Sequence, residues 1–178
     1  MLSSLLIEHD HIRKTLNLLE MQFLDLCRDR TPDYSMMLSI VVYIQEYPEQ
    51  VHHPLEDAIF SVLLKRGSDE GKLIRELVTD HTELEVVTRD LRRCIELFSN
   101  GTGDKEKLKH QLSAFLFRQR RHLYIEEMNV YPLVKHVLTE QDWKDIQSMA
   151  PYLDAPVFGE RTRNDYELLY REIEGKYK

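Results

Sequence analysis

Residues 5–26, LLIEHDHIRKTLNLLEMQFLDL, carry the apolar stripe that decides the fold class. Its members lie alternately four and three residues apart, and they are Leu5, His9, Ile12, Leu16, Leu19, Phe23 and Leu26. This spacing places every member on one face of an α-helix, because residues three and four apart share a face. The stretch therefore predicts a helix over about 2–28, which Thr31-Pro32-Asp33 ends.

Residues 77–98, LVTDHTELEVVTRDLRRCIELF, repeat this pattern 72 positions later, so that His81 takes the place of His9. A second shift, of 70 positions, superposes segment 52–56 on segment 122–126. A repeat of this kind indicates two helix hairpins of similar design that pack against each other.

Three further helices are expected at about 34–66, 70–99 and 104–138, the last two separated by Asn100-Gly101-Thr102-Gly103. Within 34–66, the two prolines Pro48 and Pro54 each lack a backbone donor, which predicts a kink or short break.

The remainder of the chain predicts a helical extension over 139–178. Thr139 is the expected N-cap of a short helix that carries Trp143 and Ile146. A last amphipathic helix, expected to pack across the bundle, carries Tyr166, Leu169, Tyr170 and Ile173. The fold class is therefore all-α: an up-down-up-down four-helix bundle with additional short C-terminal helices. We expect one domain over 1–178, with its bundle core over about 2–138.

Composition and charge argue against several classes of protein. The chain has 178 residues, and its 6 Gly and 6 Pro are too few for a strand-and-turn architecture. A net charge of -7 argues against a nucleic-acid partner, which needs a surplus of cations. The sequence has no apolar run of about 18 residues, so no membrane span is predicted. Cys27 and Cys94 form no CxxC motif, which favours a reduced, cytoplasmic protein.

Six polar residues occupy the predicted core stripes at similar depths in such a bundle. They are His9, His52, Glu56, His81, His122 and Glu126. The two His-Glu pairs are spaced i, i+4, so both side chains of each pair share a helix face. One histidine on an apolar stripe is more often a packing residue than a ligand. Burying six such groups together, however, costs several kcal/mol each unless something compensates. Two metal ions per chain would compensate, and imidazole with carboxylate suits iron, manganese or zinc.

The remaining histidines are assigned by helical position. His53 is a possible additional ligand, but it lies about 100° around the helix from His52, which favours an outer or surface role. His11 is off the stripe, and His110 and His136 are expected at the surface.

The sequence also suggests, less strongly, which side chains lie next to the predicted ligands. Asp57 and Glu127 are candidates for hydrogen bonds to the ligands. Some aromatic residues nearby could hydrogen-bond the ligands or lie beside the metal, but packing is the simpler role for most of them; they are Tyr43, Tyr47, Tyr124 and Tyr131.

These residues resemble the signatures of hemerythrin-like (HHE cation-binding) proteins, and the tail, with Asp142-Trp143 and residues 155–159, resembles bacterial members. The matching segments are HHPLED at 52–57, HLYIEE at 122–127 with VYP at 130–132, EHDHI at 8–12 and DHTEL at 80–84. The resemblance spans about residues 5–138. It implies a non-haem di-iron centre inside a four-helix bundle, in which the two glutamates bridge the irons.

The chain also departs from the oxygen-carrying members of that family. They place HxxxH on the third helix, whereas Glu85 stands four residues after His81 here. Their last-helix carboxylate is an Asp in HxxxxD, where this chain offers Glu126 and Glu127; the repeat symmetry with Glu56 favours Glu126. Reversible oxygen carriage is therefore not expected, and a carboxylate at 85 would favour the ferric state if it lay near the iron.

The resemblance and the residues together favour a non-enzymatic di-iron protein that senses, binds or stores iron, oxygen or nitric oxide. Its expected partner is a small diatomic ligand, O2 or NO; a protein partner is not predicted. The alternative is a di-iron enzyme for ferrous iron oxidation, peroxide or nitric oxide detoxification, or iron-sulfur repair. The sequence offers no obvious acid or base besides the ligands, which disfavours that alternative. A metal-free helical interaction module is the third possibility.

Overall fold

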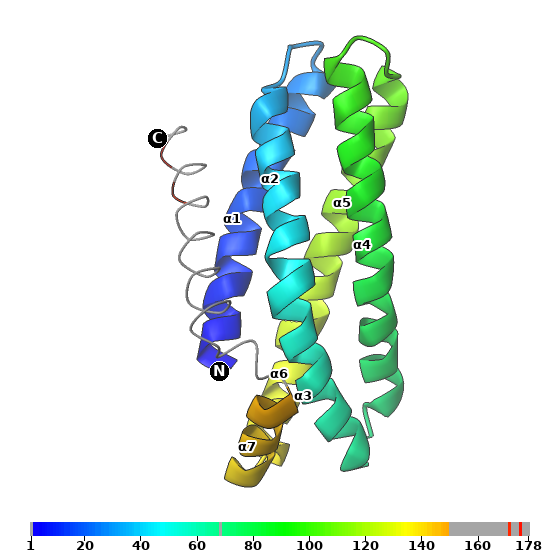
Figure 1. The fold of residues 1–178 in the computed structure, drawn as a ribbon. Helices are drawn as coiled ribbons and strands as arrows, with labels where there is room; N and C mark the ends of the chain where they lie inside the picture. Colours follow the sequence, from blue (N-terminus) through cyan, green and yellow to red (C-terminus); the bar gives the residue numbers. More distant parts are fainter. Residues whose placement is uncertain (1, 68, 150–170, 172–174, 176–178) are drawn as a thin grey trace.

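The computed structural model describes residues 2–67 and 69–149, together with 171 and 175, and these contain helices and no strand (Figure 1). The helices are α1 (Leu2–Cys27), α2 (Tyr34–Glu46), η1 (Pro48–His52), α3 (His53–Lys65), α4 (Gly71–Ser99), α5 (Lys105–Ile125), η2 (Glu126–Val130), α6 (Tyr131–Val137) and α7 (Glu140–Met149). None of these described helices is long and apolar enough to cross a membrane.

Four rods form the bundle: α1, α2-η1-α3, α4 and α5-η2-α6. α1 packs against α2 and α5, and α4 packs against the same two helices, so the rods form a closed ring. Figure 1 shows that consecutive rods run in opposite directions. The predicted all-α, up-down-up-down four-helix bundle is confirmed.

The predicted helix ends agree with the structure to within one or two residues, and local chemistry explains them. Asp33 and Asp104 are N-caps whose carboxylates accept the backbone N–H three residues later. Gly67 and Gly101 follow the ends of α3 and α4 with φ of +75° and +76°, a conformation that glycine adopts without steric cost.

η1 and η2 are π-helical turns, in which each N–H bonds to the carbonyl five residues earlier. The N–H of His53 bonds to the Pro48 carbonyl, and the N–H of Tyr131 bonds to the Glu126 carbonyl. Each turn therefore contains one residue more than an α-helical turn, which rotates the following side chains. The expected break near Pro48 is this π-helical turn, whereas Pro54 lies in the first turn of α3, where a missing N–H costs little.

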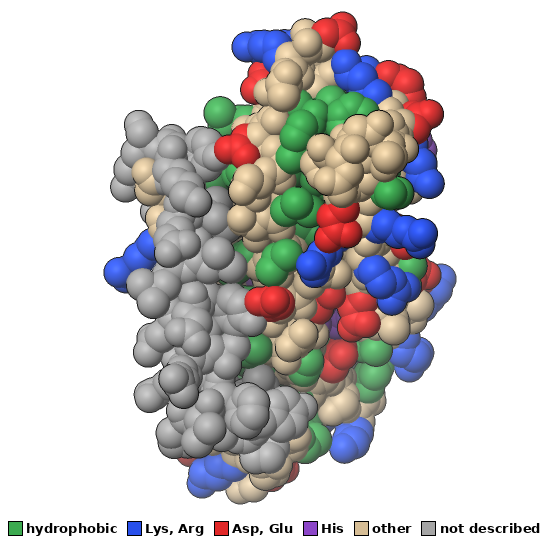
Figure 2. Space-filling view, turned by 45° about the horizontal axis from the view of Figure 1, so that its top comes forward, with side chains coloured by type: hydrophobic (Ala, Val, Ile, Leu, Met, Phe, Trp, Pro, Cys, Tyr) green, Lys and Arg blue, Asp and Glu red, His purple; other side chains and the backbone are tan. Residues whose placement is uncertain are grey.

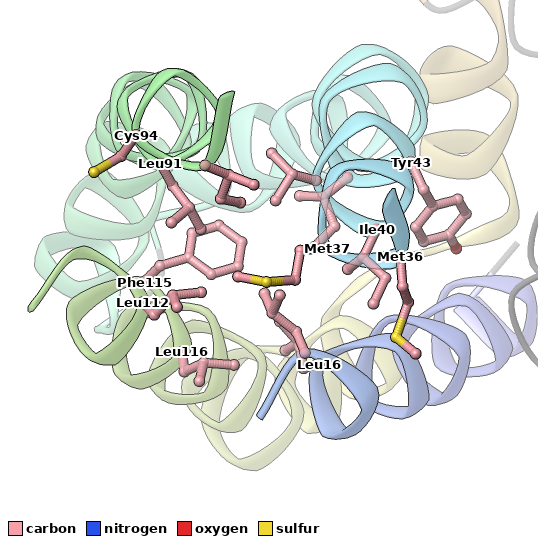
Figure 3. Packing of buried hydrophobic residues seen from close by; sticks show 14 of the residues in the cluster. Leu16, Met36, Met37, Ile40, Tyr43, Leu91, Cys94, Leu112, Phe115 and Leu116 are labelled. Carbon is pink, nitrogen blue, oxygen red and sulfur yellow. The ribbon is translucent and has the colours of Figure 1, made fainter. Parts of the chain in front are cut away.

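Two apolar clusters fill the bundle. One lies toward the α1–α2 and α4–α5 connections, where Leu16, Met37 and Phe115 point toward one another (Figure 3). The other lies toward the opposite end and includes Leu5 and Phe60. Along each of the four rods, the predicted ligands fall between members of the first cluster and members of the second. The polar site is therefore a layer between two apolar layers.

α7 begins at the predicted cap. The carboxylate of Asp142 accepts hydrogen bonds from the Thr139 N–H at 2.7 Å and from its hydroxyl at 2.6 Å. Arg66 at the end of α3 donates to the same carboxylate at 2.9 Å. The short helix with Trp143 and Ile146 is confirmed. The predicted helix with Tyr166, Leu169, Tyr170 and Ile173 lies outside the described residues.

Histidine contributes only small areas to the face shown in Figure 2, where Lys and Arg lie beside Asp and Glu. The basic side chains of α5 form such pairs: Arg118 with Asp80 on α4, and Arg120 with Glu20 on α1.

Candidate metal centre

The structure brings together all six residues predicted from the core stripes, and adds His53. None of the seven is more than 4% exposed, and they are His9, His52, His53, Glu56, His81, His122 and Glu126. They come from all four rods of the bundle. Seven buried titratable groups in one layer need partners of opposite charge, because an unpaired buried charge is strongly unfavourable.

The first group of potential ligands consists of His9, His52 and Glu56, whose donor atoms all lie within 4.8 Å of one another. The Nε2 atoms of His9 and His52 are 3.0 Å apart. Two atoms bound at about 2.1 Å to one metal ion and at a right angle lie about 3.0 Å apart, so this spacing fits two ligands of one ion.

The second group consists of His53, Glu56, His81 and His122, whose donor atoms again lie within 4.8 Å of one another. The Nε2 atoms of His81 and His122 are 3.1 Å apart. The His53 ring stacks on the His81 ring, with centroids 4.2 Å apart and an interplanar angle of 6°. This group therefore has three imidazoles, and the first group has two.

The two glutamates lie between the groups. Glu56 places Oε1 3.6 Å from His9 Nε2 and Oε2 3.5 Å from His81 Nε2. Glu126 places Oε2 3.5 Å from His9 Nε2 and Oε1 3.0 Å from His122 Nε2. Glu126 thus directs one oxygen toward each group. Glu56 Oε2 is also 3.4 Å from His52 Nε2, so this oxygen lies between the two groups. Both carboxylates are therefore near enough to each group to serve as bridging ligands.

Carboxylates also lie behind the imidazoles of the first group. His9 Nδ1 donates to Glu127 Oε1 at 2.9 Å, and His52 Nδ1 donates to Glu8 Oε2 at 2.8 Å. Glu127 is further paired with Arg13 on α1. A carboxylate can only accept, so these bonds assign the proton of each neutral ring to Nδ1 and leave Nε2 free to bind a metal.

In the second group, a carboxylate lies beside the Nδ1 atom of two imidazoles, and one of the two contacts is a hydrogen bond. His81 Nδ1 donates to Asp57 Oδ1 at 2.9 Å, while His122 Nδ1 faces Asp80 Oδ2 at a longer 3.4 Å. The predicted contacts of Asp57 and Glu127 with the ligands are confirmed. The corresponding roles of Glu8 and Asp80 were missed, although each stands directly before a ligand histidine in the sequence.

The carboxylates and imidazoles of the centre shift one another's pKa values. Burial alone would raise the pKa of Glu56, but the neighbouring histidines outweigh it and hold that pKa well below its usual range. Burial would lower the pKa of His81 and His122, but the surrounding carboxylates raise them to about 12 and about 9. The carboxylates therefore stay ionised, and in the metal-free protein protons on His81 and His122 balance part of their charge.

Buried polar atoms without hydrogen-bond partners indicate whether these residues fit a metal ion. Glu56 Oε2, both carboxylate oxygens of Glu126 and His122 Nδ1 are buried with no hydrogen-bond partner among the described residues. Buried polar atoms are rarely left unsatisfied. Carboxylate oxygens with unused lone pairs beside imidazole nitrogens are suitable ligands for a divalent cation, so the residues fit the metal.

The expectation of a surface position for His53 is wrong, and the structure places it in the second group of potential ligands. His53 is 4% exposed, and burial together with the nearby His81 holds its pKa well below the usual range, so the ring is neutral. The prediction assumed a regular α-helix. The π-helical turn η1 adds a residue before His53 and turns it toward the bundle axis.

Glu85 does not replace a ligand. Its side chain is exposed, and it belongs to neither group. His110 and His136 are exposed as predicted, and His11 is also outside both groups. With His53, the two groups together contain five imidazoles.

The tyrosines divide between packing and the centre. Tyr43 and Tyr47 pack in the apolar cluster as expected, and Tyr124 is 63% exposed. Tyr131 differs, because its buried hydroxyl donates to Glu56 Oε1 at 2.6 Å. The aromatic position before Pro132 was the only signal for it in the sequence.

Residues 1–134 match the family described as hemerythrin HHE cation binding domain. All seven residues of the centre lie inside this range. No curated protein matches the chain.

Proposed function

We propose that this chain, which belongs to the hemerythrin HHE cation-binding family, uses its cation site to hold two iron ions. The observation that carries the proposal is the convergence of five imidazoles and two carboxylates in one buried layer. The proposed ligands are His9, His52, Glu56, His53, His81, His122 and Glu126. Imidazole and carboxylate also suit manganese and zinc, and the resemblance to di-iron proteins favours iron.

We further propose that the centre responds to a small diatomic molecule, O2 or NO, rather than turning over a larger substrate. Two ferrous ions in such a site supply electrons and coordination positions for a diatomic ligand. The protein's own contribution is to hold the imidazoles by their Nδ1 protons and to enclose the layer between apolar clusters. A gas diffuses through such packing, whereas a polar substrate does not.

An enzymatic role is the second candidate, and Glu49 is the observation that favours it. Its Oε1 is buried without a hydrogen-bond partner among the described residues, one turn before His53. Burial, together with the charge of Glu85, raises its pKa to about 7, although Thr88 opposes the rise. A carboxyl group with this pKa can both donate and accept a proton at neutral pH.

The two cysteines support a cytoplasmic location within this proposal. Cys27 and Cys94 are both free thiols, and Cys94 is buried. Disulfides form in oxidising compartments and are rare in the cytosol, so unpaired cysteines favour a reducing compartment.

Metal analysis of protein produced with ample iron tests the centre. We expect two ions per chain, a marked loss in His122→Ala and no loss in His110→Ala, because His110 is exposed and distant from the groups. Unchanged metal content in His122→Ala would contradict the proposed ligands.

Ligand response and turnover then distinguish the two candidates. The sensor proposal expects a spectral response of the loaded protein to nitric oxide or oxygen, with few turnovers of ferrous iron or peroxide. Sustained turnover over many cycles that Glu49→Gln slows, without loss of metal, would instead support the enzyme.

A further inference from the structure

The Tyr131 hydroxyl lies inside the centre, beside the group with fewer imidazoles. Tyr131 is 3% exposed, and its Oη is 2.9 Å from His9 Nε2 and 2.6 Å from Glu56 Oε1. Its ring stacks on the His9 ring, with centroids 5.1 Å apart. The hydroxyl oxygen is thus as close to His9 Nε2 as the Nε2 atom of His52 is.

The contact between Tyr131 and His9 has the spacing of two ligands of one ion. The Tyr131 hydroxyl donates its proton to Glu56 Oε1, so its oxygen offers lone pairs rather than a proton to His9 Nε2, which lies 2.9 Å away. This distance is the one expected for two neighbouring ligands of one metal ion.

The π-helical turn η2 places the hydroxyl there. In a regular α-helix, residues 126 and 131 would lie about 140° apart around the axis. The bond from the Tyr131 N–H to the Glu126 carbonyl widens the turn, so that both side chains face the centre.

The two groups differ in their number of ligands. The group around His81 has three imidazoles in addition to the glutamates, and the group around His9 has two. We propose that the Tyr131 oxygen is the missing protein ligand of the ion held by His9 and His52. This inference rests on the proposed function, because it requires an iron ion in that group. Binding breaks the phenolic O–H bond, forms the metal–oxygen bond and releases the proton to water.

A phenolate ligand changes the expected chemistry of the centre. Its negative charge stabilises the trivalent ion relative to the divalent ion, which is the effect first attributed to Glu85. It also fills one coordination position of the ion held by His9 and His52. The reduced protein is therefore expected to oxidise in air without reversible oxygen uptake.

Resonance Raman spectroscopy of the oxidised, iron-loaded protein tests the inference. A ferric ion bound to tyrosinate gives a visible charge-transfer band, whose excitation enhances vibrations of the tyrosine ring. We expect this band in the wild type, its loss in Tyr131→Phe and its persistence in Tyr43→Phe, a buried control in the apolar cluster. In the wild type, ring-deuterated tyrosine should shift the enhanced vibrations, a measurement that does not depend on the folding of any variant.

Two results would overturn the inference. If the wild type holds two ions per chain without this band, or if the band survives in Tyr131→Phe, the hydroxyl serves only as a hydrogen-bond donor to Glu56. Failure of the proposed function has a different signature, because neither the wild type nor Tyr131→Phe would then hold two ions, and both proposals would fall.

Discussion

At the scale of single residues, the protons of the imidazoles decide what the centre can bind. His9, His52 and His81 each donate Nδ1–H to a carboxylate, which leaves Nε2 directed into the bundle. Such a carboxylate fixes the orientation of the ring and makes Nε2 more basic. His53 differs, because its Nδ1 is buried without a partner among the described residues. It is held by packing against His81 instead.

His53→Gln is expected to weaken metal binding by at least roughly 10-fold, by analogy with the loss of a ligand's supporting contacts. Removing His53 leaves the second group with two imidazoles and the glutamates. Metal content after dialysis against a mild chelator measures the effect, and the exposed His110→Gln is the control. If His53→Gln retained two ions as tightly as the control, His53 would be only a stacking partner of His81.

The pH dependence of metal affinity follows from the raised pKa of two histidines. In the metal-free protein, His81 and His122 have pKa values of about 12 and about 9, so both are protonated at pH 7. Metal must displace these protons, and affinity should therefore rise with pH, by roughly tenfold per pH unit for each proton released. Titrations between pH 6 and 8 measure the slope. An affinity independent of pH would mean that neither histidine binds the metal.

At the scale of elements, hydrophobic spacing was sufficient to predict the rods but not their internal turns. The ends of α1 and α4 follow from the apolar stripes and the residues that stop them. Apolar spacing alone does not reveal the extra residue in η1, because the apolar residues before and after it both keep helical spacing. The orientations of His53 and Tyr131 both depend on such a turn. His9 and His81 were predictable because they lie on the regular stripes of α1 and α4. The two His-Glu pairs were predictable because each keeps the i, i+4 spacing of one helix face.

Asp142→Ala should detach α7 from α3, because one carboxylate both caps α7 through Thr139 and accepts from Arg66. We expect the melting temperature to fall by roughly 2–4 °C and amide exchange in α7 to accelerate, with Asp145→Ala as the exposed control on the same helix. The pKa of Asp142 is lowered to about 2, first by Thr139 and then by Arg66. The contribution of the Asp142 carboxylate to folding stability is therefore present above its ordinary pKa of 3.8. It is lost as the pH falls toward 2. Equal amide exchange in both variants would contradict this role.

At the scale of the whole molecule, the centre is a polar layer between two apolar clusters. Each cluster joins all of the rods on its own side by apolar packing, which does not depend on metal. The layer between them has buried oxygens of Glu56 and Glu126 without partners among the described residues. Without a cation, this layer is therefore the weakest part of the bundle.

Metal removal should accordingly lower the stability of the fold without abolishing it. A ligand bound only by the folded state adds about 2.7 kcal/mol when its free concentration is 100 times its dissociation constant. For a chain of this size, that corresponds to a rise in melting temperature of roughly 5–11 °C. Thermal unfolding of iron-loaded and chelator-treated protein measures the difference, and Glu126→Gln with His122→Ala should remove it.

Hydrogen exchange locates the same effect within the molecule. If the apolar clusters hold the rods independently, metal removal should accelerate amide exchange in the segments around His9, His52, His81 and His122. Exchange near Leu16 and Phe115, inside the first cluster, should change much less, because that packing persists without metal. Uniform acceleration over all four rods would show that the bundle unfolds as one unit. Equal melting temperatures and exchange rates with and without metal would mean that this buried layer is not where the metal binds.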